Sequence, residues 1–247
     1  MSIITGDIAD SPPVAQGTGT ASPLASSSFT PTDGTLIIVL AAAGWSGATQ
    51  ANITVSDTGS HTWSNPVIAK GTSSNGGTVG IFYTYIAKSS GAIVVNTAFS
   101  GFASGSGGRF ADIILLWGAA SDQTGAAVAS KISTTGLDGT FSITTTKRNS
   151  WVFGVSDDAT NGATWTPNAN TGQDSQFNNT TDNVTSAAWF GNFYTGTPGA
   201  TTFGGTWAAN GASNHTTQQC AFEVLPALDL PIRPVIVAKS LVRSHRY

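Results

Sequence analysis

The sequence predicts an all-β protein, and three observations support this prediction. From residue 29 to residue 225, short runs rich in β-branched and aromatic residues alternate with turns rich in Gly, Asn, Asp and Thr. No part of that region carries a sustained helical period of apolar residues. Only 9% of the residues are charged, so most of the polar surface must come from Ser, Thr, Asn and Gln, as in β-rich extracellular and virion proteins.

The first element, residues 1–28, is expected to be an N-terminal arm or linker. Its stretch SPPVAQGTGTASPLASSS consists of small residues with Pro, Gly and Ser. The opening MSIITGDIAD carries acids where a secretory signal peptide carries bases, and it has no long apolar core. The longest apolar run, LIIVLAAAGW, is about half a membrane span. We therefore expect no membrane insertion, and synthesis in a cytoplasm that the chain leaves inside a larger assembly.

The body is expected to contain two sets of strands. The clearest strand of the first set is the continuous apolar run TLIIVLAAA, and the clearest of the second is SWVFGVSD. The first set covers residues 35–43, 52–57, 80–87, 92–99 and 111–118. The second set covers residues 140–146, 150–157, 186–194, 200–207 and 217–225.

The two sets read as one unit written twice. A shift of about 108 residues places GIFYTYIA over AAWFGNFY and residues 111–117 over 219–225. We therefore expect two tandem pseudo-repeats of about five or six strands, residues 29–125 and 126–228. Two packed sheets are the usual solution for such a chain, so the expected fold is a β-sandwich of the jelly-roll or Ig-like kind. The sequence leaves open whether the repeats form two sandwiches or one interleaved sandwich.

A family resemblance rests on the order of these elements. The residues that carry it are GTLIIVLAAAGW, HTWSNP, ADIILLWGA, NSWVFGVSDD, ATWTP and CAFEVLPA. This pattern resembles the Gly/Thr-rich β domains of minor tail proteins and other virion structural proteins of phages that infect actinobacteria. The resemblance covers residues 29–226 and implies a structural or adhesive part of a virion, exposed on the exterior of the particle, with no inherited catalytic residues.

No arrangement of reactive side chains predicts catalysis, a metal site or a cofactor. The three histidines form no pair at a metal-binding spacing, and Cys220 is the only cysteine. Glu223 is the only glutamate, and no spacing selects a second carboxylate for glycoside hydrolysis. We therefore expect a protein that is not an enzyme. Residues 1–230 carry six bases and 13 acids, which argues against nucleic acid as a partner.

Three tryptophans at strand ends or turns are candidate glycan-binding residues, because an indole face can stack on a sugar ring. They are Trp45, Trp63 and Trp165. Capping the end of the β-structure is the competing role for each of them. A host cell-envelope glycan is the corresponding expected ligand.

The last element, residues 229–247, is expected to be a basic docking tail. Its β-branched run suits the addition of a strand to the sheet edge of a neighbouring subunit, and its bases suit an acidic patch there. The residues expected to bind a partner are Arg233, Val235, Ile236, Val237, Lys239, Arg243 and Arg246. The expected function is that of a minor tail protein of a phage, assembled with other virion proteins and with copies of itself. The alternatives are a capsid decoration or head-fibre protein and a carbohydrate-binding adhesion module.

Overall fold

The chain is described by a computed structural model in which all regular structure is β-strand. Every pairing between its strands is antiparallel, and the described ranges contain no helix. The prediction of an all-β chain is therefore confirmed. The structure describes residues 5–7, 22–44, 52–71, 77–101, 108–133, 140–158, 165–167, 186–194, 197–207 and 216–227.

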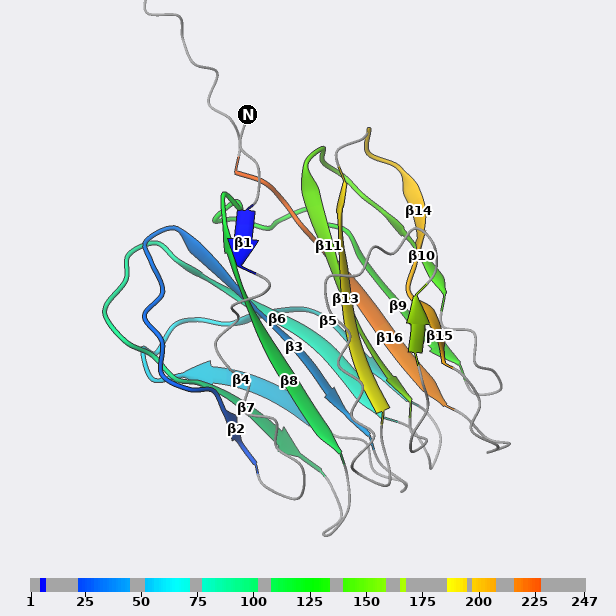
Figure 1. Ribbon diagram of the computed structural model, residues 1–247, viewed down its shortest axis with the longest axis horizontal. Coiled ribbons are helices and arrows are strands. Elements are labelled where there is room, and N and C mark those ends of the chain that lie inside the picture. The colour runs from blue at the N-terminus through cyan, green and yellow to red at the C-terminus, as the bar shows by residue number, and fades with distance from the viewer. Residues whose placement is uncertain are drawn as a thin grey trace, which may run out of the picture.

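The largest sheet has five strands and is centred on β3 (Thr35–Ala43). Nine residue pairs join β3 to β6, from Thr35 opposite Ile86 to Ala43 opposite Thr78. The order across the sheet is β1-β8-β3-β6-β5 (Figure 1). The other four strands are β1 (Thr5–Asp7), β8 (Arg109–Trp117), β6 (Thr78–Ile86) and β5 (Ser64–Lys70).

A second large sheet has four strands in the order β13-β11-β16-β9. Its centre is β11, which pairs with β13 along its whole length on one side and with β16 on the other. The strands are β13 (Ser186–Tyr194), β11 (Ser150–Asp158), β16 (Thr217–Val224) and β9 (Val128–Ser133).

Three small sheets complete the strand pairings. One has three strands in the order β2-β7-β4. The other two are the pairs β10–β14 and β12–β15, and Gly204, with φ 95°, separates β14 from β15. Their strands are β2 (Leu24–Ala25), β7 (Val95–Ser100), β4 (Asn52–Asp57), β10 (Phe141–Thr144), β14 (Ala200–Phe203), β12 (Trp165–Pro167) and β15 (Gly205–Trp207).

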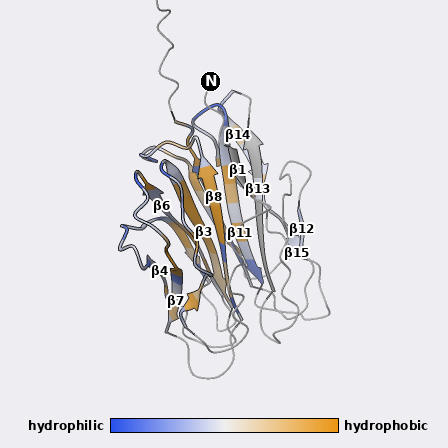
Figure 2. Cartoon of the chain, turned by 60° about the vertical axis from the view of Figure 1, so that its left-hand side comes forward, coloured by the Kyte–Doolittle hydropathy of each residue, from blue (hydrophilic) through white to orange (hydrophobic). Residues whose placement is uncertain are grey.

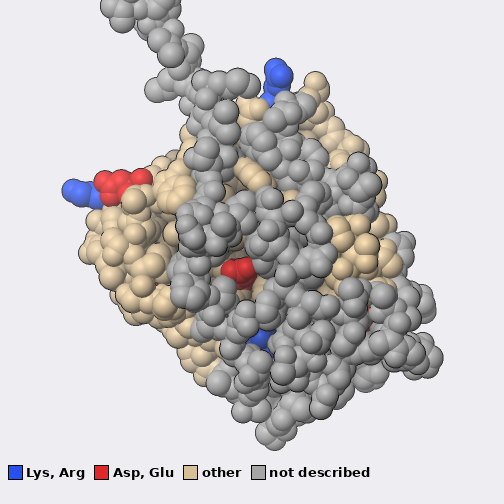
Figure 3. Space-filling model, in the orientation of Figure 1, with Lys and Arg blue, Asp and Glu red and all other residues tan. Residues whose placement is uncertain are grey.

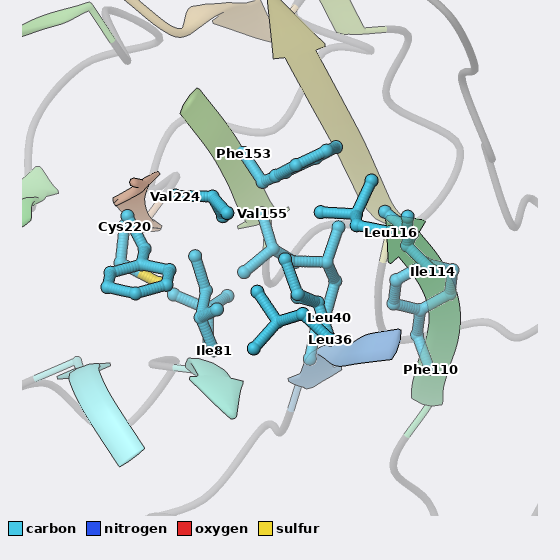
Figure 4. Packing of buried hydrophobic residues seen from close by; sticks show 14 of the residues in the cluster. Leu36, Leu40, Ile81, Phe110, Ile114, Leu116, Phe153, Val155, Cys220 and Val224 are labelled. Carbon is cyan, nitrogen blue, oxygen red and sulfur yellow. The ribbon is translucent and has the colours of Figure 1, made fainter. Parts of the chain in front are cut away.

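Three hydrophobic clusters lie between these sheets. The first joins the two large sheets through side chains such as Leu40 and Ile81 on one side and Phe153 and Val155 on the other (Figure 4). The second lies between the five-stranded sheet and the β2-β7-β4 sheet. The third lies between the four-stranded sheet and the two small pairs, and it contains Trp207. Each large sheet is therefore covered on both faces.

Burial on both faces explains why β3 reads as an unbroken apolar run. Its even-numbered side chains from Leu36 to Ala42 enter the first cluster, and its odd-numbered ones from Ile37 to Ala43 enter the second. A strand with one solvated face would alternate apolar and polar residues instead. The hydropathy colouring shows the same concentration of apolar residues in β3 and β8 (Figure 2).

Most of the predicted strands are present, with boundaries within a few residues. The predicted strand 200–207 is divided into β14 and β15 at Gly204. Five strands were not predicted: β1, β2, β5, β9 and β12. None of them shows a strong strand pattern in the sequence. Three have only two or three residues, and β5 contains Pro66 at a register shift. In β9 every second side chain is exposed, and these include Val128 and Ile132.

Two of these unpredicted strands lie in residues 1–28, the segment expected to be an arm. β1 pairs with the end of β8, and β2 pairs with β7. The side chain of Leu24 is buried in the second cluster. The hydroxyl of Ser22 accepts a hydrogen bond from the backbone N–H of Phe99 at 2.9 Å and donates one to the Phe99 carbonyl at 3.0 Å.

Candidate functional site

The seven partner-binding residues predicted in the C-terminal tail lie outside the described residues, and so does Trp45. The described chain ends at Ala227, whose backbone N–H donates to the carbonyl of Gly118 at 2.7 Å. The last described residue before the expected tail therefore lies beside the end of β8.

Trp63 lies in a hydrogen-bonded turn between β4 and β5. Its indole N–H donates to Oδ2 of Asp57 at 2.6 Å, and Oδ1 of Asp57 lies 2.9 Å from Nδ1 of His61. Burial alone would raise the pKa of Asp57, but the hydrogen bonds from Trp63 and His61 outweigh it and hold the pKa below its usual value. The ring of Trp63 is partly buried against the second hydrophobic cluster. Its observed contacts therefore stabilise the turn.

Trp165 is buried, with an exposed fraction of 2%. It lies in β12 opposite Trp207 of β15, inside the third hydrophobic cluster. A tryptophan in this position offers no exposed indole face on which a sugar ring could stack. Trp165 is therefore a core residue. The Gly- and Asn-rich sequence around it did not indicate this position.

Two adjoining hollows in the described surface form a groove. Each hollow has a volume of about 580 Å³, which lies within the range of about 300–1,000 Å³ typical of ligand pockets. Tyr85 and the loop residues Ser121, Asp122 and Thr124 line both hollows, so they form the boundary at which the two join. We call this feature the groove; its two arms extend toward Lys147 and Arg148 on one side and toward His61 and Tyr83 on the other.

Strand alternation brings the two tyrosines of β6 to the groove. Val79, Ile81, Tyr83 and Tyr85 share the face of β6 that enters the first cluster, and the tyrosines lie at its end. The ring of Tyr83 stacks on Phe222, with 5.4 Å between the ring centroids and an interplanar angle of 5°. Within the described residues, neither phenol hydroxyl has a hydrogen-bond partner. The hydroxyls of Tyr83 and Tyr85 are therefore available to a ligand.

One wall of the groove is held by the buried amide of Gln123. Its Nε2 donates to the carbonyl of Ala120 at 2.8 Å, and its Oε1 accepts the backbone N–H of Leu225 at 2.7 Å. These bonds attach the loop that contains Ser121, Asp122 and Thr124 to the end of β16. The loop is exposed, but its anchor is only 4% exposed.

The opposite wall is held by the buried carboxylate of Glu223. Its oxygens accept the backbone N–H and the hydroxyl of Thr146, the backbone N–H of Lys147 and the backbone N–H of Ala127, at 2.8 to 3.0 Å. Hydrogen bonds to a carboxylate are shorter and stronger than those between neutral groups. Glu223 therefore fixes the turn that presents Lys147, Arg148 and Asn149 to the groove.

The lining of the groove has a local positive charge. Lys147 and Arg148 are exposed, and neither side chain has a carboxylate partner among the described residues. Asp122 is the acid in the same lining, and its Oδ1 accepts the backbone N–H of Thr124 at 2.8 Å. Charged side chains are sparse over the described part of the face shown in Figure 3, so two adjacent cations are a distinctive feature of this chain.

No local pattern in the sequence predicts this groove. Its residues come from four separate segments, around residues 61–64, 83–85, 119–124 and 147–149, together with the residues that follow β16, 225–227. The available signals were two tyrosines in a position otherwise held by aliphatic residues, and one glutamate in an apolar strand. Neither signal indicates that the segments meet.

No group of three or more His, Cys, Asp or Glu side chains is arranged to hold a metal ion in the part of the chain that the structure describes. Over the same residues, no helix has the length and apolar character needed to cross a membrane. Comparison with known proteins gave no matching family model, no matching curated protein and no matching solved structure.

Proposed function

We propose that the chain is a non-enzymatic structural component of a bacteriophage virion, a minor tail protein at the tail tip. The proposal is supported by the charge-poor composition, by the all-β structure with three clusters between its sheets, and by the resemblance of its sequence pattern. The chain would be assembled in the host cytoplasm and exposed on the exterior of the particle. A capsid decoration or head-fibre protein is the alternative within the same class.

We also propose that the chain consists of two tandem pseudo-repeats, each of which is a two-layer β-sandwich. The strand order β1-β8-β3-β6 has a counterpart in β9-β16-β11-β13, and the β2-β7-β4 sheet has a counterpart in β10, β14/β15 and β12. β6 begins at residue 78 and β13 at 186, while β8 begins at 109 and β16 at 217, so both pairs are offset by 108 residues. This offset equals the shift found in the sequence, and it supports a duplication.

The observation that carries the assembly proposal is the exposed edge strand β9. Val128 and Ile132 are 49% and 38% exposed, and they are the large exposed hydrophobic side chains among the described residues. Both lie on β9, which pairs with β16 on one side and is the last strand of its sheet among the described residues. An edge strand with apolar side chains is a template for a further strand. The β-branched run Val235–Val237 from the tail of a neighbouring copy is the partner that we propose.

The test compares self-association of the full chain with that of two variants by sedimentation equilibrium. Deletion of residues 229–247 and the substitution Ile132→Lys are both expected to abolish oligomers and to leave the monomer folded. Thr54→Lys, which adds the same charge on the exposed face of β4, is the matched control and should associate normally. A monomeric full-length chain, or oligomers unaffected by both changes, would contradict the tail-to-edge proposal.

The place in the virion needs its own measurement. A structural subunit should be found in purified particles at a fixed copy number by quantitative mass spectrometry, and a cryo-electron microscopy map should place it in the tail or on the capsid. Absence from particles would contradict the proposed class of function. The second candidate, a carbohydrate-binding adhesion module, is favoured by one observation, namely the groove lined by Tyr83, Tyr85 and polar loop residues.

A further inference from the structure

We propose that the groove binds an acidic saccharide, with the sugar hydroxyls at its tyrosine arm and a carboxylate or phosphate substituent at Lys147 and Arg148. The inference develops the carbohydrate-binding alternative and does not depend on a place in a virion. The groove is a different site from Trp63 and Trp165, because Trp165 is buried and the indole N–H of Trp63 is bonded to Asp57.

The tyrosine arm of the groove combines hydroxyl groups with aromatic rings. Tyr83 and Tyr85 present phenol hydroxyls without partners in the described part of the chain, next to Thr62, Ser64 and Thr124. Hydroxyl groups that both donate and accept hydrogen bonds, placed beside aromatic rings, match a polyhydroxylated ring with one apolar face. A purely apolar ligand would leave these hydroxyls without hydrogen bonds, at a cost in free energy.

The other arm of the groove is charged. Lys147, Arg148 and Asp122 give the described lining one net positive charge, whereas residues 1–230 as a whole carry seven net negative charges. Asp122 is already engaged by Thr124 in its own turn. Arg pairs with carboxylate and phosphate through two parallel hydrogen bonds, and Lys adds a second cation. An anionic substituent is therefore favoured over a neutral or cationic one.

The walls of the groove are preorganised. The exposed loop 121–124 is attached through buried Gln123, and the turn 147–149 is attached through buried Glu223. Both anchors join their loops to β16 or to the residue that follows it. Walls that are already held in place lose little conformational entropy when a ligand binds, which favours affinity. Turns that are hydrogen-bonded only to water would lose more conformational entropy on binding.

The experiment is a titration of the full chain with two tetrasaccharides, followed by isothermal calorimetry and by amide chemical shifts. A hyaluronan tetrasaccharide carries two uronic acids, and the neutral probe is the tetramer of N-acetylglucosamine. The acidic probe is expected to bind about tenfold more tightly, since charge-assisted hydrogen bonds are stronger than neutral ones. Its shifts should concentrate at residues 121–124 and 147–149.

The double variant Lys147→Ala/Arg148→Ala is expected to bind the acidic probe no better than the neutral one. Lys88→Ala, which removes an exposed cation outside the groove, is the matched control and should bind like the native chain. If the acidic probe binds equally well to the double variant, or if both probes bind equally to the native chain, the proposed site is wrong although the chain binds glycans. If neither probe binds, the groove proposal and the adhesion alternative both fail, and the structural proposal stands on its own test.

Discussion

Glu223 shows how one buried side chain can define a loop at the surface. Its carboxylate has no exposed area and accepts hydrogen bonds from three backbone N–H groups and one hydroxyl. Of these donors, Lys147 lines the groove, Thr146 precedes it, and Ala127 follows the loop 121–124. Glu223, the only glutamate in the sequence, thus holds both the segment at Ala127 and the turn at Thr146 and Lys147.

Glu223→Gln is expected to lower the free energy of unfolding by about 2–3 kcal/mol, because the amide turns a donor toward backbone N–H groups and leaves buried partners unsatisfied. Urea unfolding followed by tryptophan fluorescence measures the change. Asp122→Asn, at an exposed carboxylate of the groove, is the control and should change stability much less than Glu223→Gln. An equal effect of the two substitutions would contradict the role of Glu223 as an anchor.

Asp157 presents the opposite situation, a buried carboxyl group without compensation. Neither of its oxygens has a hydrogen-bond partner in the described part of the chain. Burial, and secondarily repulsion from Asp158, raise the pKa of Asp157 well above its usual value. The folded state then keeps a proton that the unfolded chain has lost. The free energy of unfolding contributed by this group therefore falls as the pH rises from about 4 toward the raised pKa.

Asp157→Asn is expected to remove this dependence, because the amide cannot ionise. The variant should gain stability relative to the native chain as the pH rises from 4 to 8, measured by urea unfolding at intervals of one pH unit. For Asp122, hydrogen bonds from Thr124 lower the pKa, so Asp122→Asn should show a slight trend of the opposite sign. Parallel pH profiles of the native chain and Asp157→Asn would show that the carboxyl group is not buried in the neutral form.

At the scale of elements, the β12–β15 pair depends on a glycine. A Cβ atom at Gly205 would lie 2.5 Å from two ring carbons of Trp165 and would also meet the carbonyl oxygen of Thr166. The ring of Trp165 therefore packs directly against the backbone of Gly205 in the third cluster, which also contains Trp207. Glycine is needed here because of this contact, and not because of its backbone dihedral angles.

Gly205→Ala is therefore expected to destabilise the chain by about 2 kcal/mol, since neither the indole ring nor the strand backbone can move freely. Thermal unfolding followed by near-ultraviolet circular dichroism measures both the stability and the environment of the tryptophans. At Gly199 an added Cβ has only the carbonyl oxygen of Thr197 within 4 Å, at 3.9 Å, so Gly199→Ala is the control. If Gly205→Ala leaves the stability unchanged, β12 is not packed against β15 as described.

At the scale of the whole molecule, the two large sheets share one core. Cys220 has no exposed area and lies in the first cluster, between the sheets. Burial also raises the pKa of its thiol, so the reactive thiolate is suppressed in the folded state. The thiol can react only when the sheets separate or the chain unfolds.

Cys220 should therefore react with a thiol reagent at the rate of global unfolding, and the reaction should be negligible in the native protein over hours. Leu40→Ala, on the other side of the same cluster, is expected to cost about 3 kcal/mol and to increase the labelling rate by up to about two orders of magnitude. Thr54→Ala, at an exposed site on β4, should leave the rate unchanged. Labelling much faster than unfolding would show that the sheets open as separate units.

The strands were easiest to predict where both faces of the strand are buried. A strand covered on both faces, such as β3 or β11, reads as a continuous apolar run, and its boundaries in the sequence nearly coincide with those in the structure. A strand such as β9 is recognised with more difficulty, because its exposed face carries Val128 and Ile132 where polar residues are expected. Short strands depend on their neighbours for pairing, and their own sequences carry little signal.

The all-β character and most strands followed from the sequence alone, because hydrophobic periodicity and turn residues act over a few residues. The groove was decided only by the tertiary structure. Its walls come from segments up to about 160 residues apart, joined by Gln123 and Glu223, and the distance in space between such segments is set by sheet pairing and packing, which no local pattern records.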